Sequence, residues 1–211
     1  MLLHFDYDGV IVDSFDQLLA AAQRATTLSG VGRPPTREDF ETMEDFTTNG
    51  IAARLGIPRD QMQIYGARLH TLLIGEAHAP PPFPGIPAML RTLAAHHTIV
   101  IITSNLTPLV QRGLRGAQLE GCVSLILDAL RPGTKGDKIQ RALEQFESPP
   151  RESFMIGDTR SDIRHGKAAG VRTIAVTWGY QKRHILEQEQ PDWFVDSPDE
   201  LLKVLSRGTA E

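Results

Sequence analysis

The stretch HFDYDGVIVDS, residues 4–14, places three aspartates on or beside an apolar run. Strands usually exclude aspartate, so this run is either an acidic turn or a strand that presents carboxylates. Asp6 and Asp8 are two residues apart, and side chains two residues apart on a strand point to the same side. Gly9 then lets the backbone leave the strand sharply. We therefore predict that the first strand carries the carboxyl groups of Asp6 and Asp8 to one site.

The composition is that of a globular protein with an ordinary hydrophobic core. The chain has 211 residues, of which 41% are hydrophobic and 23% charged, so it fits one large domain or a core with a smaller insertion. The net charge of -4 supplies no basic field, and we expect neither nucleic acid nor a membrane as a partner. A single cysteine, Cys122, excludes an internal disulfide and fits a reducing compartment. We expect a cytoplasmic protein; the sequence does not indicate its oligomeric state.

The segment after this first run has helical periodicity. From Phe15 onward, apolar side chains recur at the spacing of one helix face until Gly30 and Gly32 end the pattern. The proline-rich HAPPPFPG, residues 78–85, suits neither a helix interior nor a central strand and predicts a connection. Between them, two apolar sets predict two longer helices and a third stretch predicts a short one: Phe40, Met43 and Phe46; Met62, Tyr65, Leu69, Leu72 and Leu73; and GIAARLGIP, residues 50–58.

The remainder of the chain alternates between β-rich runs and segments that can form helices. The main runs are TIVIIT (98–103), VSLIL (123–127), SFMIGD (153–158) and TIAVTW (173–178), and a short strand and a terminal helix follow them. This alternation predicts an α/β fold with a mostly parallel sheet that is covered by helices on both faces. We expect residues 1–14 and 83–211 to form this core domain, and residues 15–82 to form an inserted helical domain.

Polar side chains follow several of the predicted strands. Besides Asp6 and Asp8, the strand ends and the loops beside them carry Thr103, Ser104, Lys135, Asp158 and Asp162. Ligands of open α/β sheets gather at the carboxyl ends of the strands, so we expect these groups to meet at one edge.

The chemistry of these groups is that of phosphoryl transfer. Carboxylates from two strands can hold a hard cation such as Mg²⁺, which favours phosphate-bearing partners. A carboxylate held against such a cation stays ionised and can act as a nucleophile, and a second carboxyl can protonate a leaving alcohol. The Thr103 hydroxyl, backbone N–H groups and the Lys135 ammonium can neutralise phosphoryl oxygens.

Four motifs together resemble those of the haloacid dehalogenase-like superfamily: DYDGVIVDS, the IVIITSN strand, the lysine of TKGDKI, and MIGDTRSDIRHGKAAGVRTIAVTWGY. With a helical insertion followed by FPGIPAML, the chain is similar to the branch of phosphoglycolate phosphatase and β-phosphoglucomutase. The motifs cover residues 4–14 and 83 to about 180. The resemblance implies a Rossmann-like core and makes residues 15–82 an α-helical cap domain.

The resemblance also implies roles for the acidic residues. Asp6 would be the nucleophile that takes the phosphoryl group, and it would also bind Mg²⁺. Asp8 would be the general acid and base and would give its backbone carbonyl to the metal. Asp158 would be a further Mg²⁺ ligand, and Asp162 would support the metal directly or through its neighbours. An acid at Asp8 disfavours halide displacement, because the dehalogenase branch lacks one there.

By the same resemblance, Thr103 and the Ser104 amide would bind the phosphate, and Lys135 would bridge the phosphate and Asp6. Lys138 competes for this last role, because the proline that often follows the lysine in this branch is absent. We favour Lys135, since it precedes the apolar helix face of residues 139–146, whereas Lys138 would lie inside that helix and be solvated.

Other polar residues have structural interpretations. Asp137 is a candidate N-cap for the helix after Lys135, and Asp13 and Ser14 are candidate caps for the first inserted helix. Tyr180 follows a strand and fits the edge of the site as well as it fits simple packing.

The sequence supports three functions. The first is a Mg²⁺-dependent phosphatase that hydrolyses a small phosphomonoester metabolite through an aspartyl-phosphate at Asp6. The second is a phosphomutase of the β-phosphoglucomutase type, and the third is a non-catalytic phosphate-binding module. The insertion holds arginines in no recognisable sugar-phosphate motif, so the mutase ranks second; they include Arg24, Arg33, Arg37, Arg54 and Arg68.

Overall fold

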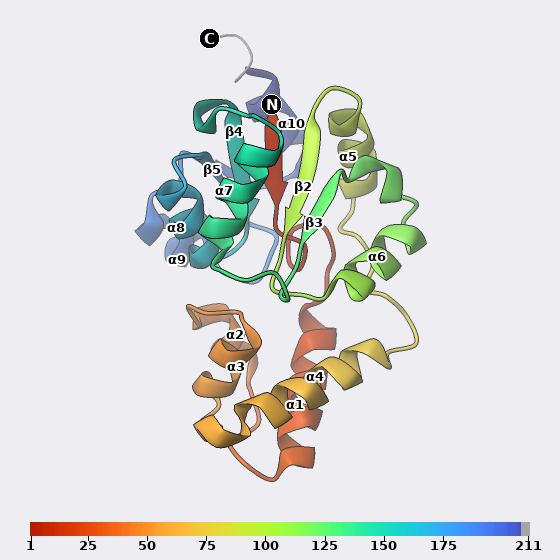
Figure 1. Ribbon diagram of the computed structural model, residues 1–211, viewed down its shortest axis with the longest axis vertical. Coiled ribbons are helices and arrows are strands. Elements are labelled where there is room, and N and C mark those ends of the chain that lie inside the picture. Colours follow the sequence, from red (N-terminus) through yellow and green to blue (C-terminus); the bar gives the residue numbers. More distant parts are fainter. Residues whose placement is uncertain (208–211) are drawn as a thin grey trace.

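A computed structural model describes residues 1–207 and contains one six-stranded parallel sheet (Figure 1). The strand order is β3-β2-β1-β4-β5-β6, and every neighbouring pair is parallel. The strands are β1 Leu2–Phe5, β2 Thr98–Ile102, β3 Leu125–Leu127, β4 Ser153–Gly157, β5 Arg172–Val176 and β6 Trp193–Val195. The predicted α/β class with a parallel sheet is confirmed.

Helices cover both faces of the sheet (Figure 1). They are α5 Ile86–Ala94, α6 Thr107–Gly116, α7 Lys135–Gln145, α8 Arg160–Ala168, α9 Arg183–Leu186 and α10 Pro198–Arg207. In β1, Leu3 and Phe5 pack with α5, α6 and α10, whereas Leu2 packs with α7 on the other face. Because side chains alternate along a strand, each buried strand supplies apolar groups to both layers.

A second group of helices lies beyond one end of the sheet, at the bottom of Figure 1. This helical group consists of α1 Phe15–Ser29, α2 Arg37–Thr42, α3 Thr48–Arg54 and α4 Met62–Ile74. Single turns of tighter helix lie at Arg59–Gln61, Glu120–Cys122, Pro150–Glu152 and Glu187–Glu189. The helical group has its own hydrophobic cluster, which includes Ala22, Phe40 and Leu69. All buried members of this cluster come from residues 15–82 except Tyr180, which lies in the loop after β5.

The second inserted helix is shorter than predicted. Helix α2 has only six residues, because Met43 is extended (φ -69°, ψ 153°) and ends it. Phe46 lies in the loop that leads into α3, whose N-cap is Thr47. Both Met43 and Phe46 still pack in the cluster of the helical group, so their apolar character reflected burial rather than a continuous helix.

The two connections between the helical group and the sheet run side by side. Asp13 donates its N–H to the carbonyl of Pro81 at 2.9 Å, and Phe83 donates to Ile11 at 3.1 Å. A single β-bridge joins Val12 to the same returning segment. The division of the chain into residues 1–14 with 83–211 and residues 15–82 stays a prediction.

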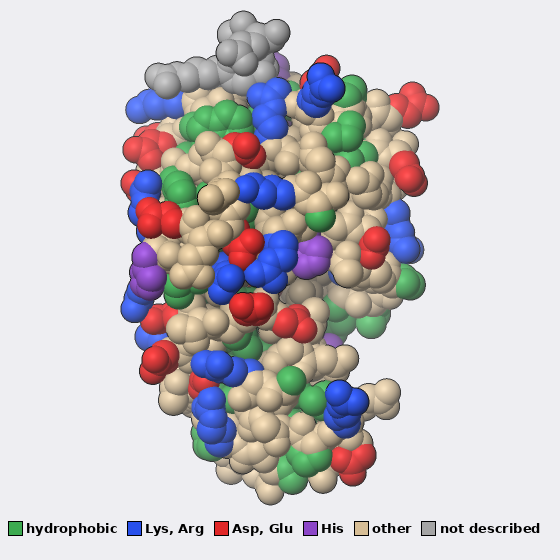
Figure 2. Space-filling view, turned by 90° about the vertical axis from the view of Figure 1, so that its left-hand side faces the viewer, with side chains coloured by type: hydrophobic (Ala, Val, Ile, Leu, Met, Phe, Trp, Pro, Cys, Tyr) green, Lys and Arg blue, Asp and Glu red, His purple; other side chains and the backbone are tan. Residues whose placement is uncertain are grey.

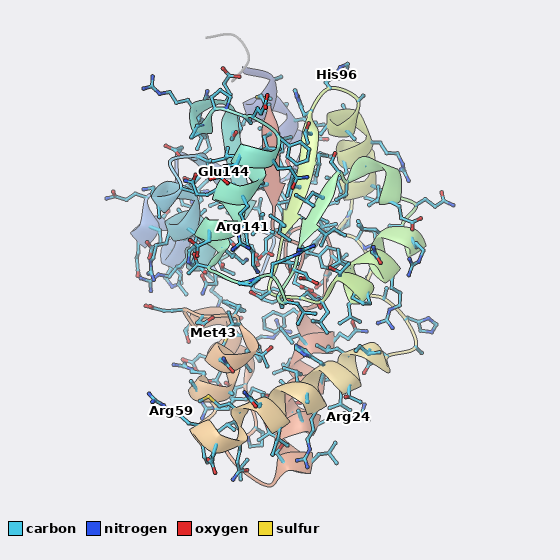
Figure 3. The ribbon with its side chains drawn as sticks, viewed as in Figure 1. Arg24, Met43, Arg59, His96, Arg141 and Glu144 are labelled. Carbon is cyan, nitrogen blue, oxygen red and sulfur yellow. The ribbon has the colours of Figure 1, made fainter. Side chains whose placement is uncertain are left out.

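Ion pairs join the helical group to the sheet side on the face shown in Figure 2, where acidic and basic side chains lie close together. Arg160 contacts Glu44 at 3.2 Å, and Lys182 contacts Glu41 at 2.9 Å. The carbonyl of Met43, the residue labelled at the top of the helical group in Figure 3, accepts a hydrogen bond from the side chain of Gln181 at 2.7 Å. Exposed ion pairs of this kind contribute little stability each.

Candidate active site

Three buried carboxylates meet at the carboxyl ends of two neighbouring strands. Asp6 follows β1, Asp158 follows β4, and Asp162 lies in the first turn of α8. One carboxylate oxygen from each lies within 4.8 Å of the others. Strand β1 ends at Phe5, so Asp6 begins the following loop, although its N–H still donates to the carbonyl of Ile156 at 2.9 Å.

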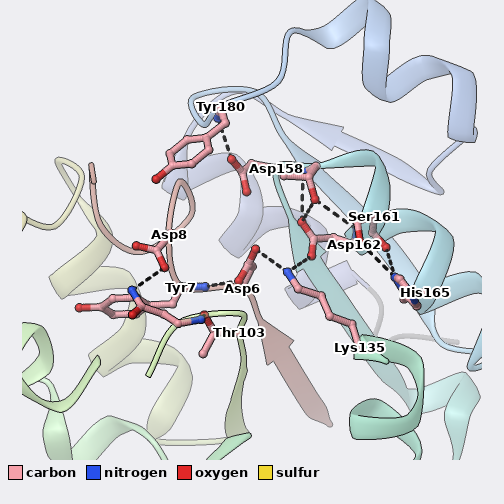
Figure 4. Close-up of polar contacts among 12 residues, drawn as sticks. Asp6, Tyr7, Asp8, Thr103, Lys135, Asp158, Ser161, Asp162, His165 and Tyr180 are labelled. Atoms are coloured by element: carbon pink, nitrogen blue, oxygen red, sulfur yellow. Dashed lines mark hydrogen bonds and ion pairs between the residues drawn. The ribbon is translucent and has the colours of Figure 1, made fainter. Parts of the chain in front are cut away.

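Lys135 lies between two of these carboxylates (Figure 4). Its Nζ donates to Asp6 Oδ2 at 2.7 Å and to Asp162 Oδ1 at 2.5 Å. Burial opposes the charge of this lysine, but Asp162 and Asp6 outweigh burial and raise its pKa above the ordinary value. The N-cap of α7 is Thr134, not Asp137 as predicted; Asp137 occupies the third helical position and its carboxylate accepts from the Thr134 N–H.

Burial also shifts the acidic groups. It raises the pKa of Asp6 to about 7, although Lys135 acts in the opposite direction. Burial, together with the charges of Asp162 and Asp6, raises the pKa of Asp158 well above its ordinary value. The neutral form gains because a low-dielectric interior disfavours uncompensated negative charge.

The donor set fits a hard divalent cation. Three carboxylates share one ammonium, so the fully ionised cluster carries excess negative charge in a buried site. Asp158 Oδ2 accepts from the Tyr180 N–H at 2.7 Å, but Asp158 Oδ1 is buried and has no hydrogen-bond partner within residues 1–207. Buried polar atoms without partners are rare, and carboxylate oxygens are the ligands that Mg²⁺ prefers.

The other candidate lysine is buried, so its predicted exposure to solvent is wrong. Lys138 lies one turn into α7 and is 5% exposed. Its Nζ donates to the carbonyl of Thr103 at 3.2 Å. The face of α7 that carries Lys138 is turned toward the sheet. The spacing of the apolar residues in this helix did not indicate that Lys138 belongs to the buried face. Of the two lysines, only Lys135 has a recorded hydrogen bond to the carboxylates.

Asp8 lies apart from the three-carboxylate cluster and is held by neutral donors (Figure 4). Ser14 Oγ donates to Asp8 Oδ1 at 2.6 Å, and Asn105 Nδ2 donates to Asp8 Oδ2 at 2.9 Å. Ser14 Oγ also hydrogen bonds with the Tyr180 hydroxyl at 2.7 Å. Burial raises the pKa of Asp8, and the Ser14 and Asn105 donors offset part of this effect.

The sequence did not connect three residues of this network with Asp8. Ser14 stands at the N-cap position of α1 but makes no capping hydrogen bond with its side chain, so the prediction that it caps the helix is wrong. Asn105 follows β2, the strand beside β1. Its position as a polar residue after a predicted strand is the signal that could have marked it as a site residue. Tyr180 links Asp8, through Ser14, to Asp158, through its own N–H. This link joins loops far apart in sequence, and no local pattern reveals it.

One cavity collects the predicted catalytic and phosphate-binding residues. Its lining includes Asp6, Asp8, Thr103, Ser104 and Lys135. Asp158 and Asp162 are fully buried. Each contacts a residue that lines the cavity: Asp162 accepts from Lys135, and Asp158 accepts from the Tyr180 N–H. Thr103 Oγ accepts a hydrogen bond from the Asn105 N–H at 2.9 Å, which shapes the turn after β2.

Helices α1, α3 and α4 close the cavity on the side away from the sheet. None of the helices within residues 1–207 is long and apolar enough to cross a membrane.

The fold and the site define a class of protein: parallel α/β proteins with a buried acidic cluster and a lysine at the carboxyl edge of the sheet. A family model for haloacid dehalogenase-like hydrolases matches residues 3–176. The chain belongs to this family and is a hydrolase, which confirms the resemblance seen in the four motifs.

Curated relatives include two phosphoglycolate phosphatases that match along the whole chain. The protein from Synechococcus elongatus is 26% identical over 208 residues, covering 96% of each chain. The protein from Aquifex aeolicus is 27% identical over 215 residues, covering 98% of this chain and 97% of the relative. The pyrophosphatase PpaX of Bacillus mycoides is 32% identical, but the match covers only 53% of each chain.

Solved structures share the fold over nearly the whole chain. A haloacid dehalogenase-like hydrolase from Streptococcus pneumoniae has a TM-score of 0.84 and 24% identity, covering 96% of this chain and 97% of that one. A protein from Clostridium acetobutylicum, described as a predicted phosphatase, has a TM-score of 0.87 and 19% identity, covering 98% of both. At this identity, the likeness shows the fold alone.

Proposed function

We propose that the protein is a Mg²⁺-dependent phosphatase that hydrolyses a small phosphomonoester metabolite through an aspartyl-phosphate at Asp6. The observation that carries this proposal is the placement of the Asp6 carboxylate, which touches Lys135 on one side and shares a cavity with Asp8 on the other. The phosphatase names of the relatives that match along the whole chain support the same reaction class.

The reaction would use two carboxyl groups in turn. A carboxylate oxygen of Asp6 attacks phosphorus, the bond from phosphorus to the alcohol oxygen breaks, and Asp8 donates a proton to the departing alcohol. Asp8 then takes a proton from a water molecule that attacks the phosphorus, which releases phosphate and regenerates the Asp6 carboxylate. The raised pKa of Asp8 suits a group that must begin the cycle protonated.

Three groups would hold the phosphoryl oxygens. The Thr103 hydroxyl, the Ser104 amide and the Lys135 ammonium lie around the same cavity as Asp6. Lys135 also keeps the nucleophile in place through its hydrogen bond to Asp6 Oδ2. Charges placed before the reaction in this way stabilise a transition state without reorganisation.

The metal would be held by Asp6, Asp158, Asp162 and the backbone carbonyl of Asp8. When bound, Mg²⁺ would supply positive charge to the phosphoryl oxygens and balance the buried carboxylates. Asp158 Oδ1 is buried and has no hydrogen-bond partner among the described residues, which supports this assignment.

Residues 15–82 would form a cap domain over a core of residues 1–14 and 83–211. The separate cluster of the helical group and the paired connections at Asp13 and Phe83 support this division. Closure of such a cap would exclude water from the first step and select the substrate.

The two alternative functions fit the site less well. A mutase of the β-phosphoglucomutase type must hold a sugar phosphate in two orientations, and none of the five arginines named above lies in the lining of the cavity within residues 1–207. A non-catalytic module has no need for a nucleophile, an acid, a lysine and further carboxylates together. Formation of an isomeric sugar phosphate in place of free phosphate would favour the mutase.

The proposal is tested by hydrolysis of a generic aryl phosphate by the purified full chain. We expect release of phosphate with Mg²⁺, loss of activity after chelation, and recovery when Mg²⁺ is added back. Equal rates with and without the chelator would contradict the metal requirement. If neither aryl nor alkyl monoesters are hydrolysed in the presence of Mg²⁺, the result would favour the non-catalytic phosphate-binding module.

A second prediction concerns Ser14, which positions Asp8. Ser14→Ala removes a donor to the ionised form of Asp8, so the pKa of Asp8 should rise further. Since Asp8 must be protonated for the first step, the alkaline limb of the pH profile of kcat should move to higher pH. We expect kcat at its optimum to fall by about tenfold, because a positioned acid contributes about a hundredfold or more.

Tyr180→Phe is the matched comparison for Ser14→Ala. It removes the hydroxyl that contacts Ser14 but leaves the Ser14 donor on Asp8. The pH profile of this variant should therefore move less than that of Ser14→Ala. Identical profiles for Ser14→Ala and the wild-type protein would show that Ser14 does not act through Asp8.

A further inference from the structure

Resting on the proposed phosphatase function, we propose that the natural substrate is a monoester whose leaving alcohol is apolar and carries no charge. The alcohol would lie against the side of the cavity that the helical group provides. Five apolar side chains form this apolar wall: Leu18, Phe46, Ile51, Leu69 and Leu73. They come from α1, α3, α4 and the loop before α3, so the wall is built by the insertion and not by the catalytic residues of the sheet.

The polar side chains that interrupt the wall already have partners. Thr48 Oγ1 and His70 Nε2 hydrogen bond with each other at 3.1 Å. Gln17 donates its side-chain amide to the carbonyl of His78 at 3.0 Å. Burial lowers the pKa of His70, which favours the neutral form of its ring.

The cations of the cavity lining are also engaged. Besides Lys135, which binds carboxylates, the one arginine among the described lining residues is Arg112. Its Nη1 donates to the carbonyls of Ile74 and Glu76 at 3.0 and 3.1 Å, and its Nη2 donates to Leu73 at 3.2 Å. Its Nε is buried. Arg112 therefore serves the carbonyl groups at the end of α4, a common partner of basic side chains.

None of the arginines of the insertion, Arg59 included, is among the described lining residues of the cavity. Arg33 and Arg54 bind Asp39, and this contact holds the pKa of Asp39 well below its usual range. Arg24 lies away from the sheet in Figure 3. Arg37 pairs with Asp16, Arg68 donates to the carbonyl of Leu28, and Arg24 approaches Glu76.

These contacts disfavour a leaving group with its own negative charge. A carboxylate or second phosphate would lose water against the apolar wall. The lining guanidinium that could compensate for this, Arg112, already donates from both terminal nitrogens to backbone carbonyls, and its Nε is buried. An apolar group in the same place would gain from burial. The preference would separate this protein from relatives named phosphoglycolate phosphatase and pyrophosphatase, whose named substrates carry a second anionic group.

The test compares four phosphates with the full chain and Mg²⁺: methyl phosphate, benzyl phosphate, phosphoglycolate and pyrophosphate. The three monoesters all release primary alcohols, so differences in kcat/KM report mainly on the leaving-group site. We expect benzyl phosphate to exceed methyl phosphate by about 10- to 100-fold, the gain from burying one phenyl-sized group. We expect phosphoglycolate and pyrophosphate to be no better than methyl phosphate.

The outcomes separate this inference from the function on which it rests. A ratio of benzyl to methyl phosphate near one, or phosphoglycolate or pyrophosphate as the best substrate, would overturn the inference and leave the phosphatase in place. If none of the three monoesters is hydrolysed, the proposed function itself fails.

A variant locates the preference on the wall. Leu18 is half-buried on α1, so Leu18→Lys can place an ammonium at the cavity without removing a fully buried core side chain. The ratio of benzyl to methyl phosphate should fall by about tenfold, and phosphoglycolate should gain relative to methyl phosphate. Leu28→Lys makes the same change on the same helix at a position that is 62% exposed, and should leave both ratios unchanged. An unchanged ratio in Leu18→Lys would overturn the assignment to this wall.

Discussion

Asp6→Asn should abolish the hydrolysis of an aryl phosphate, with kcat lower by about ten-thousandfold or more, as when a nucleophile is removed from other enzymes. The amide of asparagine is a poor nucleophile, so the phosphoryl group would have no acceptor on the protein. The substitution also removes the negative charge that accepts from Lys135 at 2.7 Å. Steady-state kinetics with saturating Mg²⁺ measure the effect, and thermal unfolding checks that the variant is folded.

Asp13→Asn is the matched control for Asp6→Asn. Asp13 belongs to the same acidic stretch, but its side chain is exposed and outside the lining of the cavity. The same change of a carboxylate to an amide should alter kcat by less than about twofold, since exposed substitutions away from the site have small effects. Full activity in folded Asp6→Asn would refute the assignment of Asp6 as the nucleophile.

Lys135→Met should have the second largest effect. It removes a cation that contacts two buried carboxylates, Asp6 and Asp162. Breaking a buried ion pair by removing one partner costs about 3–5 kcal/mol, so the metal-free protein should lose that much free energy of unfolding. Under the proposed function, losing the ammonium that would hold the phosphoryl oxygens should also lower kcat by about a hundredfold or more. Chemical denaturation and steady-state kinetics measure the two effects separately.

Lys138→Met provides the comparison within the same helix. Lys138 is buried as well, but its Nζ donates to the carbonyl of Thr103 rather than to a carboxylate. Its loss should cost about 1–3 kcal/mol, the penalty of leaving a buried acceptor without its donor. We expect the fall in kcat to be smaller than that of Lys135→Met. The opposite order of activities would assign the phosphate-binding role to Lys138.

Much of the fold could be predicted from local patterns, and particular elements show why. The runs that form β2, β4 and β5 are short and mostly apolar, as expected for strands buried on both faces. Helix α1 begins at Phe15 and ends where Gly30 adopts a positive φ, so periodicity and a single glycine sufficed to place it. Both signals are local, so they can be recognised in the sequence without knowledge of the tertiary fold.

Three of the wrong predictions share one cause. Helix α2 ends early because Met43 turns toward the sheet side and accepts from Gln181, which is remote in sequence. Lys138 is buried because the face of α7 that it occupies packs near Thr103. Ser14 binds Asp8 and Tyr180 instead of capping α1. In each case, a partner far along the chain outweighed the preference of the local segment.

The sequence by itself determined the class of this protein: an α/β fold, the acidic residues at its strand ends, and a family that four motifs identify. These features depend on alternation and on which residue follows each strand, and both can be read along the chain. Only the tertiary structure decided that Lys135 rather than Lys138 meets the carboxylates, that Tyr180 links Asp8 to Asp158, and that the cavity has an apolar wall. Each of these contacts joins segments that are far apart in the sequence. The packing of the helices on the sheet brings these segments together, so the contacts exist only in the folded protein.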